Sequence, residues 1–452
     1  MIFLKKGIII ESRILSLVQE EHKTMLDIKF IAENEELVKQ ALSTRSGQYD
    51  VDTVTALYAR RNQLLKQVEQ LKATRNKVSD QIAALKRAKT PCEQLIVQMK
   101  DVGEEIKAFD NELADLEPKL KEAVLSIPNI PDESVPCGKD ETHNKEIRRI
   151  GTPRDFGSGF VPRPHWEIGD DLKILDSATA AKITGARFTV YRGAGAKLER
   201  ALVNFMLDLH GGAGYTEILP PFMVNRDSMT GTGQLPKFEQ DAFVVGGTNY
   251  FLIPTAEVPV TNLLRGDVLP AADLPVNYCA YTPCFRAEAG AAGRDTRGLI
   301  RQHQFNKVEL VKFCRPENSM DELESLTLQA ESVLKKLELP YRVVLLCSGD
   351  LGFSSAKTYD IEVWMPSYGR YVEISSCSNF KDYQARRMNI KFKDAAGTGA
   401  AGTAGAAFLH TLNGSGLAVG RTVAAILENF QNSRGGVDIP SALVPYFGAE
   451  RI

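Results

Sequence analysis

The sequence predicts an α+β protein, with an N-terminal antiparallel two-helix coiled coil ahead of a larger domain that mixes strands and helices. Apolar residues recur at heptad spacing in two consecutive stretches between residues 57 and 120. Beyond residue 128, strand-like and helical segments follow one another, and residues 284–311 have the pattern of a strand, a basic loop and a second strand. A chain of 452 residues is long enough for two or more domains.

Composition and charge exclude several classes of protein. The chain is 43% hydrophobic and 25% charged, which is ordinary for a globular protein. A net charge of −2 provides no global positive field, so any RNA-binding surface must be a local patch. No apolar run reaches the ~18 residues of a membrane-spanning helix. The seven cysteines are odd in number and form no CxxC pair, so we expect a reducing, cytoplasmic location without disulfide or zinc.

Residues 1–24 are an N-terminal extension to which we assign no role. Lys5 and Lys6 precede an apolar run that is too short for a signal peptide, and several glutamates argue against a transit peptide. The following residues, 25–50, predict a short helical cap. We place a first domain at residues 25–127.

Two heptad stretches predict a helical arm over about residues 52–125. The first stretch repeats every seven residues, and the second alternates steps of four and three. A turn with Pro91 separates them, so the helices should fold back antiparallel. The apolar positions are Leu57, Leu64, Leu71, Val78 and Leu85 in the first helix, and Leu95, Met99, Val102, Ile106, Phe109, Leu113, Leu116 and Leu120 in the second.

Charge is divided unequally between these two helices. Residues 57–89 carry nine Lys or Arg against two acids, and residues 91–125 carry four Lys against nine acids. Pairing between the helices accounts for part of this, and dimerisation or spacing is the commoner role of a coiled coil. The alternative is an arm that binds RNA phosphates, with Lys86, Arg87 and Lys89 at its tip.

A second domain is predicted at residues 128–452. Six prolines between residues 128 and 164 mark its entry. His165 follows, and we interpret it as a satisfied structural histidine. Residues 196–210 predict an amphipathic helix, followed by the strand-like segment GYTEILPPFMV.

Further along, Thr255 and Glu257 stand two residues apart in FLIPTAEVPV. On a strand they would share a face, and a carboxylate there could bind an ammonium group. Alternatively, Thr255 opens a helix.

The stretch 284–311 carries the densest set of polar side chains. Arg286 and Glu288 should share one face of its first strand. On a second strand from about Leu299 to Val311, residues 301, 303, 305, 307 and 309 should share another. Arginines with Phe305 suit the phosphates and ring of a nucleotide. A solvated hairpin with a charged outer face is the alternative.

Two segments complete the pattern. Glu373, Ser375 and Ser376 are expected at a strand end, where their oxygens would suit Mg²⁺ or merely cap the strand. Residues 409–431 predict a strand, a glycine turn and a helix from near Thr422, with Arg421 seating a phosphate. Between them, the Gly/Ala-rich stretch 394–407 predicts a flexible surface loop.

Several of these segments resemble the class II aminoacyl-tRNA synthetases, in their seryl-tRNA synthetase version of bacterial type. The helix and strand of residues 196–224 resemble motif 1, FRAEAG with GRDTRGLIRQHQF and KVE resembles motif 2, and TLNGSGLAVGRT resembles motif 3. MLDIKFIAEN and EISSCSNF are also similar to the family, and the likeness covers about residues 25–452. It implies an antiparallel-sheet catalytic domain and a homodimer.

The resemblance also implies a reaction. ATP would activate L-serine to seryl-adenylate, and the seryl group would pass to the 3′ end of tRNA(Ser), with Mg²⁺ as cofactor and the arm holding the tRNA; tRNA(Sec) is a further acceptor that the sequence leaves open. Arg286 and Arg421 would be the catalytic residues. ATP would be bound by Arg286, Ala287, Glu288, Phe305, Glu373, Ile374, Ser375, Ser376 and Arg421. Serine would be bound by Thr255, Ala256, Glu257, Arg286, Glu309 and Ser415. Glu373 and Ser376 would hold the metal.

Three alternatives stay open at this point. One is another class II synthetase, such as a threonyl or prolyl enzyme. Another is a synthetase-like ligase that loads amino acids onto a carrier protein. The third is a synthetase-derived protein that binds RNA without catalysis. The helical arm argues against the first two, and the presence of Arg286, Glu373 and Arg421 together argues against the third.

Overall fold

The computed structural model describes residues 28–289, 297–394 and 405–452, which form two compact units. Residues 28–43 and 47–130 make the first unit, and residues 44–46 and 131–452 make the second. The extension predicted at residues 1–24, most of the Gly/Ala-rich loop and residues 290–296 of the basic loop lie outside the described residues. No helix among the described segments is long and apolar enough to span a membrane.

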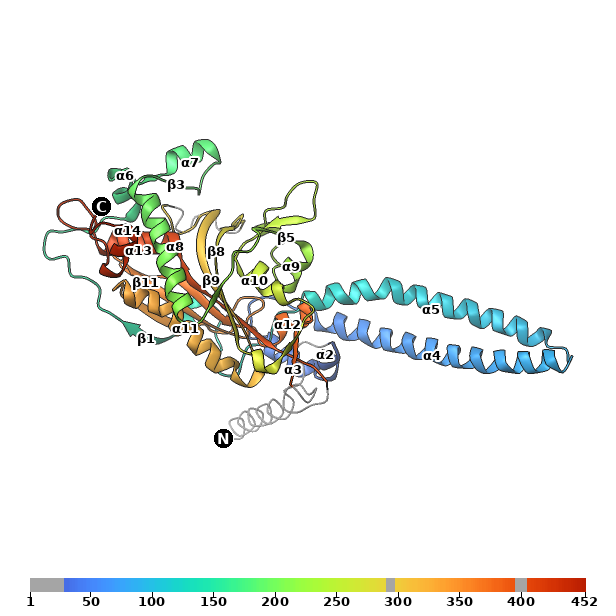
Figure 1. Cartoon of the computed structure of the whole chain (residues 1–452). Coiled ribbons are helices and arrows are strands. Elements are labelled where there is room, and N and C mark those ends of the chain that lie inside the picture. The colour runs from blue at the N-terminus through green and yellow to red at the C-terminus, as the bar shows by residue number, and fades with distance from the viewer. Residues whose placement is uncertain (1–27, 290–296, 395–404) are drawn as a thin grey trace, which may run out of the picture. The chain divides into compact units, whose positions relative to one another are not determined.

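The first unit is a helical hairpin with two short helices at its base (Figure 1). Asp50 begins the long helix α4 by accepting a hydrogen bond from the Thr53 backbone N–H at 2.9 Å. Helix α4 ends where Lys89 takes a left-handed backbone conformation (φ 56°) and the Thr90 N–H returns to the Leu85 carbonyl. The helices are α2 (Ile28–Glu33), α3 (Glu35–Leu42), α4 (Val51–Arg87) and α5 (Glu93–Leu125).

The predicted heptads form the contact between α4 and α5. Every predicted apolar position is buried or half-buried, with Leu64 and Leu120 almost fully enclosed. Burial is greatest toward the base, where the apolar residues of α2 and α3 join the same core. The hairpin therefore depends on its base for most of its hydrophobic stabilisation.

The second unit is built on an eight-stranded sheet with the order β1-β10-β11-β12-β15-β9-β8-β4. Neighbours pair antiparallel except β4 and β8, which pair in parallel, and this confirms the predicted α+β class. The strands are β1 (Lys145–Ile150), β4 (Thr216–Glu217), β8 (Val276–Phe285), β9 (Gln304–Cys314), β10 (Tyr341–Leu345), β11 (Lys357–Met365), β12 (Arg370–Asn379) and β15 (His410–Ala418).

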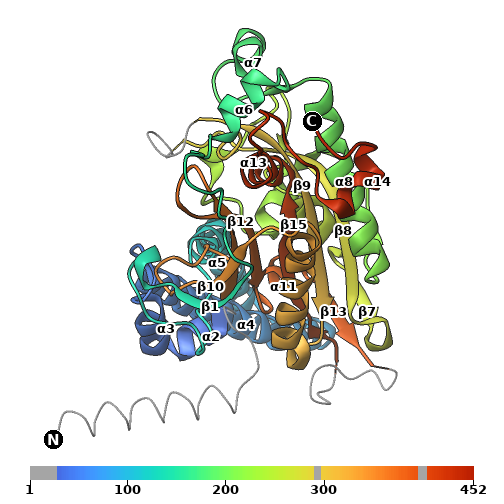
Figure 2. The same cartoon turned by 90° about the vertical axis from the view of Figure 1, so that its left-hand side faces the viewer.

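Three helices, α8 (Ala194–Gly212), α11 (Ser319–Lys336) and α13 (Val419–Asn429), pack on the sheet (Figure 2). Residues of β9 show how the two faces differ. Val308 and Leu310 join the main core with these helices, whereas Val311 and Phe313 join a separate cluster with α10 (Glu257–Thr261) and α12 (Tyr383–Met388). Phe305, Lys307 and Glu309 share the alternation of the second set, so they point away from the main core.

Smaller elements surround the sheet. Strands β5 and β6 pair next to the start of α10, and β7, β13 and β14 form a three-stranded sheet. These elements are β2 (Leu175–Asp176), β3 (Val190–Tyr191), β5 (Met223–Asn225), β6 (Tyr250–Leu252), β7 (Val268–Pro270), β13 (Lys391–Lys393), β14 (Ala407–Phe408), α6 (His165–Asp171), α7 (Ser177–Ile183), α9 (Arg226–Gly231) and α14 (Val444–Phe447).

Four local predictions were wrong. The first strand of the hairpin, expected to carry Arg286 and Glu288 on one face, ends at Phe285. The second strand of the hairpin, expected from about Leu299, begins at Gln304. Glu373 and Ser376 lie within β12 and not at its end. The predicted glycine turn before α13 is part of β15, and α13 begins at Val419.

Close packing requires glycine at two positions of β15. A Cβ at Gly414 would lie 2.4 Å from Leu326, and a Cβ at Gly416 would lie 2.6 Å from His210.

Candidate active site

A cleft of about 1100 Å³ opens on the face of the sheet opposite α8, α11 and α13. Its lining comes from strands β9, β11, β12 and β15, from the residues that follow β8, from the start of α10 and from the first turn of α13. Segments that are far apart in the sequence therefore meet in one cavity of a size suited to a nucleotide and a small substrate.

One end of the cleft holds a buried polar cluster around Glu309. The Glu309 carboxylate is ion-paired with Lys307 and accepts a hydrogen bond from Asn413 Nδ2 at 3.0 Å. Lys307 Nζ also donates to Thr255 Oγ1 at 2.8 Å. Both charged side chains are more than nine-tenths buried, so removing either one would leave the other buried without its partner in the ion pair. Ser415 also lines this end.

A second carboxylate, Glu257, begins helix α10 next to this cluster. Thr255 lies just ahead of this helix, whose N-cap residue is Ala256, so it is neither on a strand nor the N-cap. Its Oγ1 accepts the Glu257 N–H at 3.3 Å, and it lines the cleft. Gln384 donates to Glu257 Oε1 at 2.6 Å. Burial and then the Glu309 carboxylate raise the pKa of Glu257 to about 7. A cation placed between these two carboxylates would be strongly favoured.

The middle of the cleft contains arginines and an aromatic ring. The Arg286 guanidinium lies over the Phe305 ring, 5.2 Å from its centroid, and its Nε donates to the Pro254 carbonyl at 3.2 Å. Glu288 comes after β8 has ended at Phe285 and has a positive φ of 50°, and its carboxylate accepts from Arg301 Nη1 at 2.8 Å. Both pairs provide the cationic and planar surfaces that a nucleotide needs.

At the other end, Arg421 reaches from the first turn of α13 to two other segments. Its Nε donates to the Ile300 carbonyl at 3.1 Å and its Nη1 to the Glu373 carbonyl at 2.7 Å. The Glu373 carboxylate lies 3.4 Å from the same Nη1. Arg421 thus joins β12 to the segment after the basic loop.

A β-bulge brings Glu373 and Ser376 to the same side of β12. The pairing with β11 shifts between Ile361 and Glu362, which leaves Ile374 as the extra residue on β12. In a regular strand, the side chains of residues three apart point to opposite faces. The extra residue at the bulge brings Glu373 and Ser376 to the same face. Both Glu373 and Ser376 therefore line the cleft.

The oxygens around Glu373 fit a hard divalent cation. Asp360 pairs with Ser376 across β11 and β12, and one of its oxygens is buried without a hydrogen-bond partner among the described residues. Burial, and then the Glu373 carboxylate, raise the pKa of Asp360 well above its ordinary value. Since the described residues hold no cluster of three or more Asp, Glu, His or Cys arranged as a metal site, a Mg²⁺ ion here would need phosphate and water oxygens as well.

Most of the predicted site residues meet in this cleft. Arg286, Glu288, Phe305, Glu309, Glu373, Ile374, Ser376, Ser415, Arg421, Thr255 and Glu257 line it. Three do not: Ala256 is buried beside Val260, Ala287 is held through its backbone by Asp241, and Ser375 donates to the Ser415 carbonyl from inside the sheet.

Sequence reasoning also missed functional residues. Lys307 stands on the face of β9 that the alternation predicted, so that signal could have identified it, whereas Arg301 precedes the strand, which begins at Gln304. Asn413, Gln384 and Asp360 come from distant elements and carried no sequence signal. The Nε of Arg301 is buried and has no hydrogen-bond partner in the part of the chain that the structure describes.

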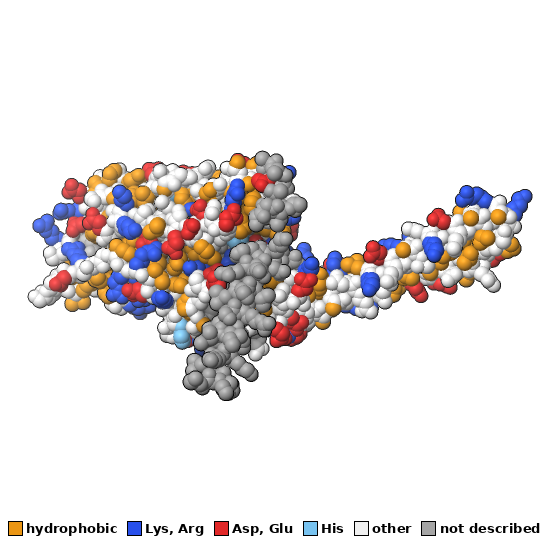
Figure 3. Space-filling view, turned by 90° about the horizontal axis from the view of Figure 1, so that it is seen from below, with side chains coloured by type: hydrophobic (Ala, Val, Ile, Leu, Met, Phe, Trp, Pro, Cys, Tyr) orange, Lys and Arg blue, Asp and Glu red, His pale blue; other side chains and the backbone are white. Residues whose placement is uncertain are grey.

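The first unit presents a basic tip. Ion pairs between α4 and α5 join Arg60 to Glu112 at 2.7 Å and Arg61 to Glu117 at 2.6 Å, with a longer one from Lys72 to Asp110. Lys86, Arg87 and Lys89 are exposed and form no ion pair with any described residue, and blue side chains mark this tip in Figure 3. Charge pairing thus explains the first half of α4 but not its tip.

Comparisons with known proteins agree over both units. Residues 25–131 match the seryl-tRNA synthetase N-terminal domain, and residues 238–430 match the tRNA synthetase class II core domain (G, H, P, S and T). A serine--tRNA ligase of Desulfitobacterium hafniense is 59% identical over 95% of this chain and 100% of its own.

Solved structures show the same likeness. Seryl-tRNA synthetase from Pyrococcus horikoshii, complexed with ATP, has a TM-score of 0.89 at 37% identity. The cytoplasmic serine-tRNA ligase of Naegleria fowleri, in complex with AMP, has a TM-score of 0.83 at 30% identity. Each covers 95% of this chain and 99% of its own.

Proposed function

The chain belongs to the seryl-tRNA synthetase family, and from this membership we propose how its cleft carries out the ligase reaction. The reaction activates serine with ATP to seryl-adenylate and then charges tRNA(Ser). One observation carries the assignment of roles. A buried pocket with two carboxylates, Glu257 and Glu309, lies in the same cavity as Arg286, Phe305 and Arg421, so an amino acid and a nucleotide can be held in contact.

Serine binds at the Glu309 end of the cleft. The ammonium group lies against Glu257, and the hydroxyl donates to Glu309, whose carboxylate is already oriented by Lys307 and Asn413. A pocket that hydrogen-bonds a hydroxyl rejects an amino acid without one, by on the order of 10⁴-fold, because its buried polar groups would stay unpaired. Thr255 and Ser415 complete the pocket.

ATP binds across the middle of the cleft. The adenine ring stacks on Phe305, and Glu288 accepts a hydrogen bond from its edge. Arg286 contacts the α-phosphate and the serine carboxylate, while Arg421 seats the γ-phosphate. The serine carboxylate then attacks the α-phosphate and pyrophosphate leaves. Rate enhancement comes from holding two anions together and neutralising their charge.

Glu373 and Ser376 would hold Mg²⁺, which when bound supplies charge neutralisation between the phosphates. The crowding of Asp360 and Glu373 supports this assignment, because a cation would relieve the repulsion between them. Arg301, whose Nε has no partner among the described residues, is a further candidate for phosphate binding.

The second step transfers the seryl group to the terminal adenosine of the tRNA. We assign tRNA binding to the first unit, with Lys86, Arg87 and Lys89 contacting phosphates.

We also propose that the protein is a cytoplasmic homodimer. Leu219, Phe222 and Met223, in the segment after α8, are large exposed apolar residues that a second copy would cover.

The test is ATP–pyrophosphate exchange with each of the twenty amino acids in the absence of tRNA. Exchange with serine alone is expected and would support the adenylate step and the pocket together. Exchange with threonine or proline would overturn the serine pocket. Absence of exchange with every amino acid, from folded protein, would favour an RNA-binding protein without catalysis.

A further inference from the structure

Helix α13 holds the segment after the basic loop at two points. Arg421 and Glu428 are seven residues apart on α13, which is close to two turns, so both side chains leave the same side of the helix. Arg421 binds the Ile300 carbonyl directly at 3.1 Å. Glu428 reaches the adjacent residue, Leu299, through the imidazole of His165.

His165 and Glu428 are both fully buried and fully hydrogen-bonded. Glu428 Oε1 lies 2.7 Å from His165 Nδ1 and also accepts the His165 backbone N–H at 3.0 Å. Its other oxygen accepts the Ser367 N–H at 3.0 Å. The carboxylate therefore fixes the orientation of the ring.

The other ring nitrogen sets the tautomer. The Leu299 backbone N–H donates to His165 Nε2 at 3.0 Å, and a backbone N–H can only donate. Nε2 is therefore the acceptor and the proton lies on Nδ1, facing Glu428. Gly298 packs directly on this ring: it has a φ of 68°, and a Cβ there would lie 2.1 Å from Nε2.

The anchored segment leads straight into the cleft. Leu299, Ile300, Arg301 and Gln302 all line it, and Arg301 forms the 2.8 Å contact with Glu288. If the Leu299 bond were lost, the Ile300 carbonyl would no longer be held in place for Arg421. Two arginines of the nucleotide site would then lose a support.

We propose that His165 is a positioning residue of the nucleotide site: its Nδ1-protonated ring ties residues 298–300 to α13, so that Arg301 and Arg421 are held ready for the phosphates. This rests on the proposed function for its effect on ATP. It touches no part of the serine pocket, so its loss should weaken ATP binding selectively.

Two substitutions test the hydrogen bonds of His165 Nδ1 and His165 Nε2 separately. His165→Asn keeps a donor near the Nδ1 position but has no acceptor for Leu299. His165→Gln places a carbonyl oxygen near the Nε2 position and should restore that bond. We expect His165→Asn to raise the KM for ATP about tenfold in serine-dependent exchange, with the KM for serine changed less than about twofold, and His165→Gln to recover most of the loss.

A measurement without ligands accompanies the kinetics. Hydrogen–deuterium exchange of peptides covering residues 297–302 should quicken in His165→Asn and stay near the original rate in His165→Gln. Glu331→Gln is the matched control, because Glu331 is equally buried, bound by Arg148 and Tyr341, and outside the cleft. It should lower stability without altering the KM for ATP.

The proposal is overturned if His165→Asn leaves both the exchange rate and the KM for ATP unchanged, or if it raises both KM values equally, as general destabilisation would. If His165→Asn fails to fold, the same measurements are made on Gly298→Ala. The added methyl group would push residues 298–300 away from the His165 ring. If the unchanged protein showed no serine-dependent exchange, the proposed function would fail, and the deuterium exchange would still decide whether His165 anchors the segment.

Discussion

At the scale of single residues, the cleft depends on two buried acids that have different neighbours. Glu309 is ion-paired with a buried lysine, whereas Glu257 accepts a hydrogen bond from an amide, and burial and the Glu309 carboxylate outweigh the effect of Lys307 and Arg286 on its pKa. Two acids in one pocket thus differ in what they can bind. Glu257 can pair with the ammonium group of serine. Glu309 is already paired with Lys307, which orients its carboxylate toward the serine hydroxyl.

Serine binding should depend on pH through Glu257. Its pKa of about 7 in the protein means that the carboxyl is largely neutral below that pH. An ammonium group needs the anion, so the KM for serine should rise about tenfold per pH unit below pH 7 and level off above it. Steady-state exchange between pH 5.5 and 8.5 measures this. Glu257→Gln should bind serine weakly at every pH, and a similar slope in that variant would exclude Glu257 as the titrating group.

Glu309 should be required for serine activation. Glu309→Gln keeps the size of the side chain but removes the charge that faces Lys307, and kcat/KM for serine should fall about 100-fold. Glu309→Ala should lose at least as much and also destabilise the fold, because Lys307 would be left buried without its partner. Serine activation that survived in Glu309→Ala would remove Glu309 from the pocket.

A further acid, Glu199 on α8, lies outside the proposed chemistry. Burial raises its pKa to about 7, although it accepts a hydrogen bond from Asn306 at 3.1 Å. Because the folded state holds this proton more tightly than the unfolded state, the stabilisation is complete below about pH 4.5 and is lost as pH rises to 7. Relative to the original chain, Glu199→Gln should gain about 3 kcal/mol between pH 4.5 and pH 8. Urea unfolding at both pH values measures it, and an equal difference at the two would contradict the assignment.

At the scale of elements, irregularities place the functional groups. The bulge at Ile374 turns Glu373 and Ser376 to one side of β12, and the early end of β8 allows Glu288 to contact Arg301.

In the helical hairpin, the base and the tip have different roles. Its base carries the apolar core and the ion pairs, and its tip carries lysines and an arginine with no ionic partner among the described residues.

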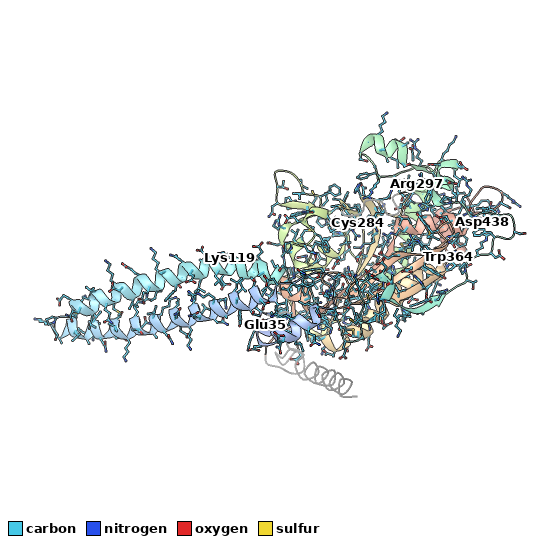
Figure 4. The ribbon with its side chains drawn as sticks, turned by 180° about the vertical axis from the view of Figure 1, so that it is seen from behind. Glu35, Lys119, Cys284, Arg297, Trp364 and Asp438 are labelled. Carbon is cyan, nitrogen blue, oxygen red and sulfur yellow. The ribbon has the colours of Figure 1, made fainter. Side chains whose placement is uncertain are left out.

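Removing the charges at the tip should weaken RNA binding alone. Replacing Lys86, Arg87 and Lys89 with Ala should lower the affinity for tRNA(Ser) and reduce the slope of its salt dependence, because fewer counterions are released. Exchange with serine, which needs no tRNA, should be unchanged. The matched control replaces three other exposed lysines of the hairpin, Lys107, Lys119 and Lys121; Lys119 is labelled on α5 in Figure 4. Equal loss of tRNA binding in both triple variants would refute a specific role for the tip.

At the scale of the whole molecule, the proposed homodimer would bury the apolar residues that follow α8. Leu219 is 77% exposed and Met223 is 52% exposed in the single chain, and exposed apolar residues this close in sequence can mark an interface. Covering them with a second copy would remove that surface from water.

Charges placed on this surface should separate the copies. Leu219→Asp with Met223→Asp is expected to halve the mass measured by light scattering, because a carboxylate cannot be buried there without a partner. Val97→Asp on α5, where Val97 is 61% exposed, is the control and should leave the mass unchanged. A parent protein that is already monomeric at micromolar concentration would contradict the homodimer.

The sequence by itself determined the features that repeat or lie close together along the chain. Heptads specified the hairpin because their period matches the helix, and alternation along β9 put Phe305, Lys307 and Glu309 on one face because strand geometry has a period of two. Only the tertiary structure decided the rest. Asn413 on Glu309, Gln384 on Glu257 and His165 on Leu299 join segments more than a hundred residues apart, and such contacts depend on how the sheet and helices pack, which no local period encodes.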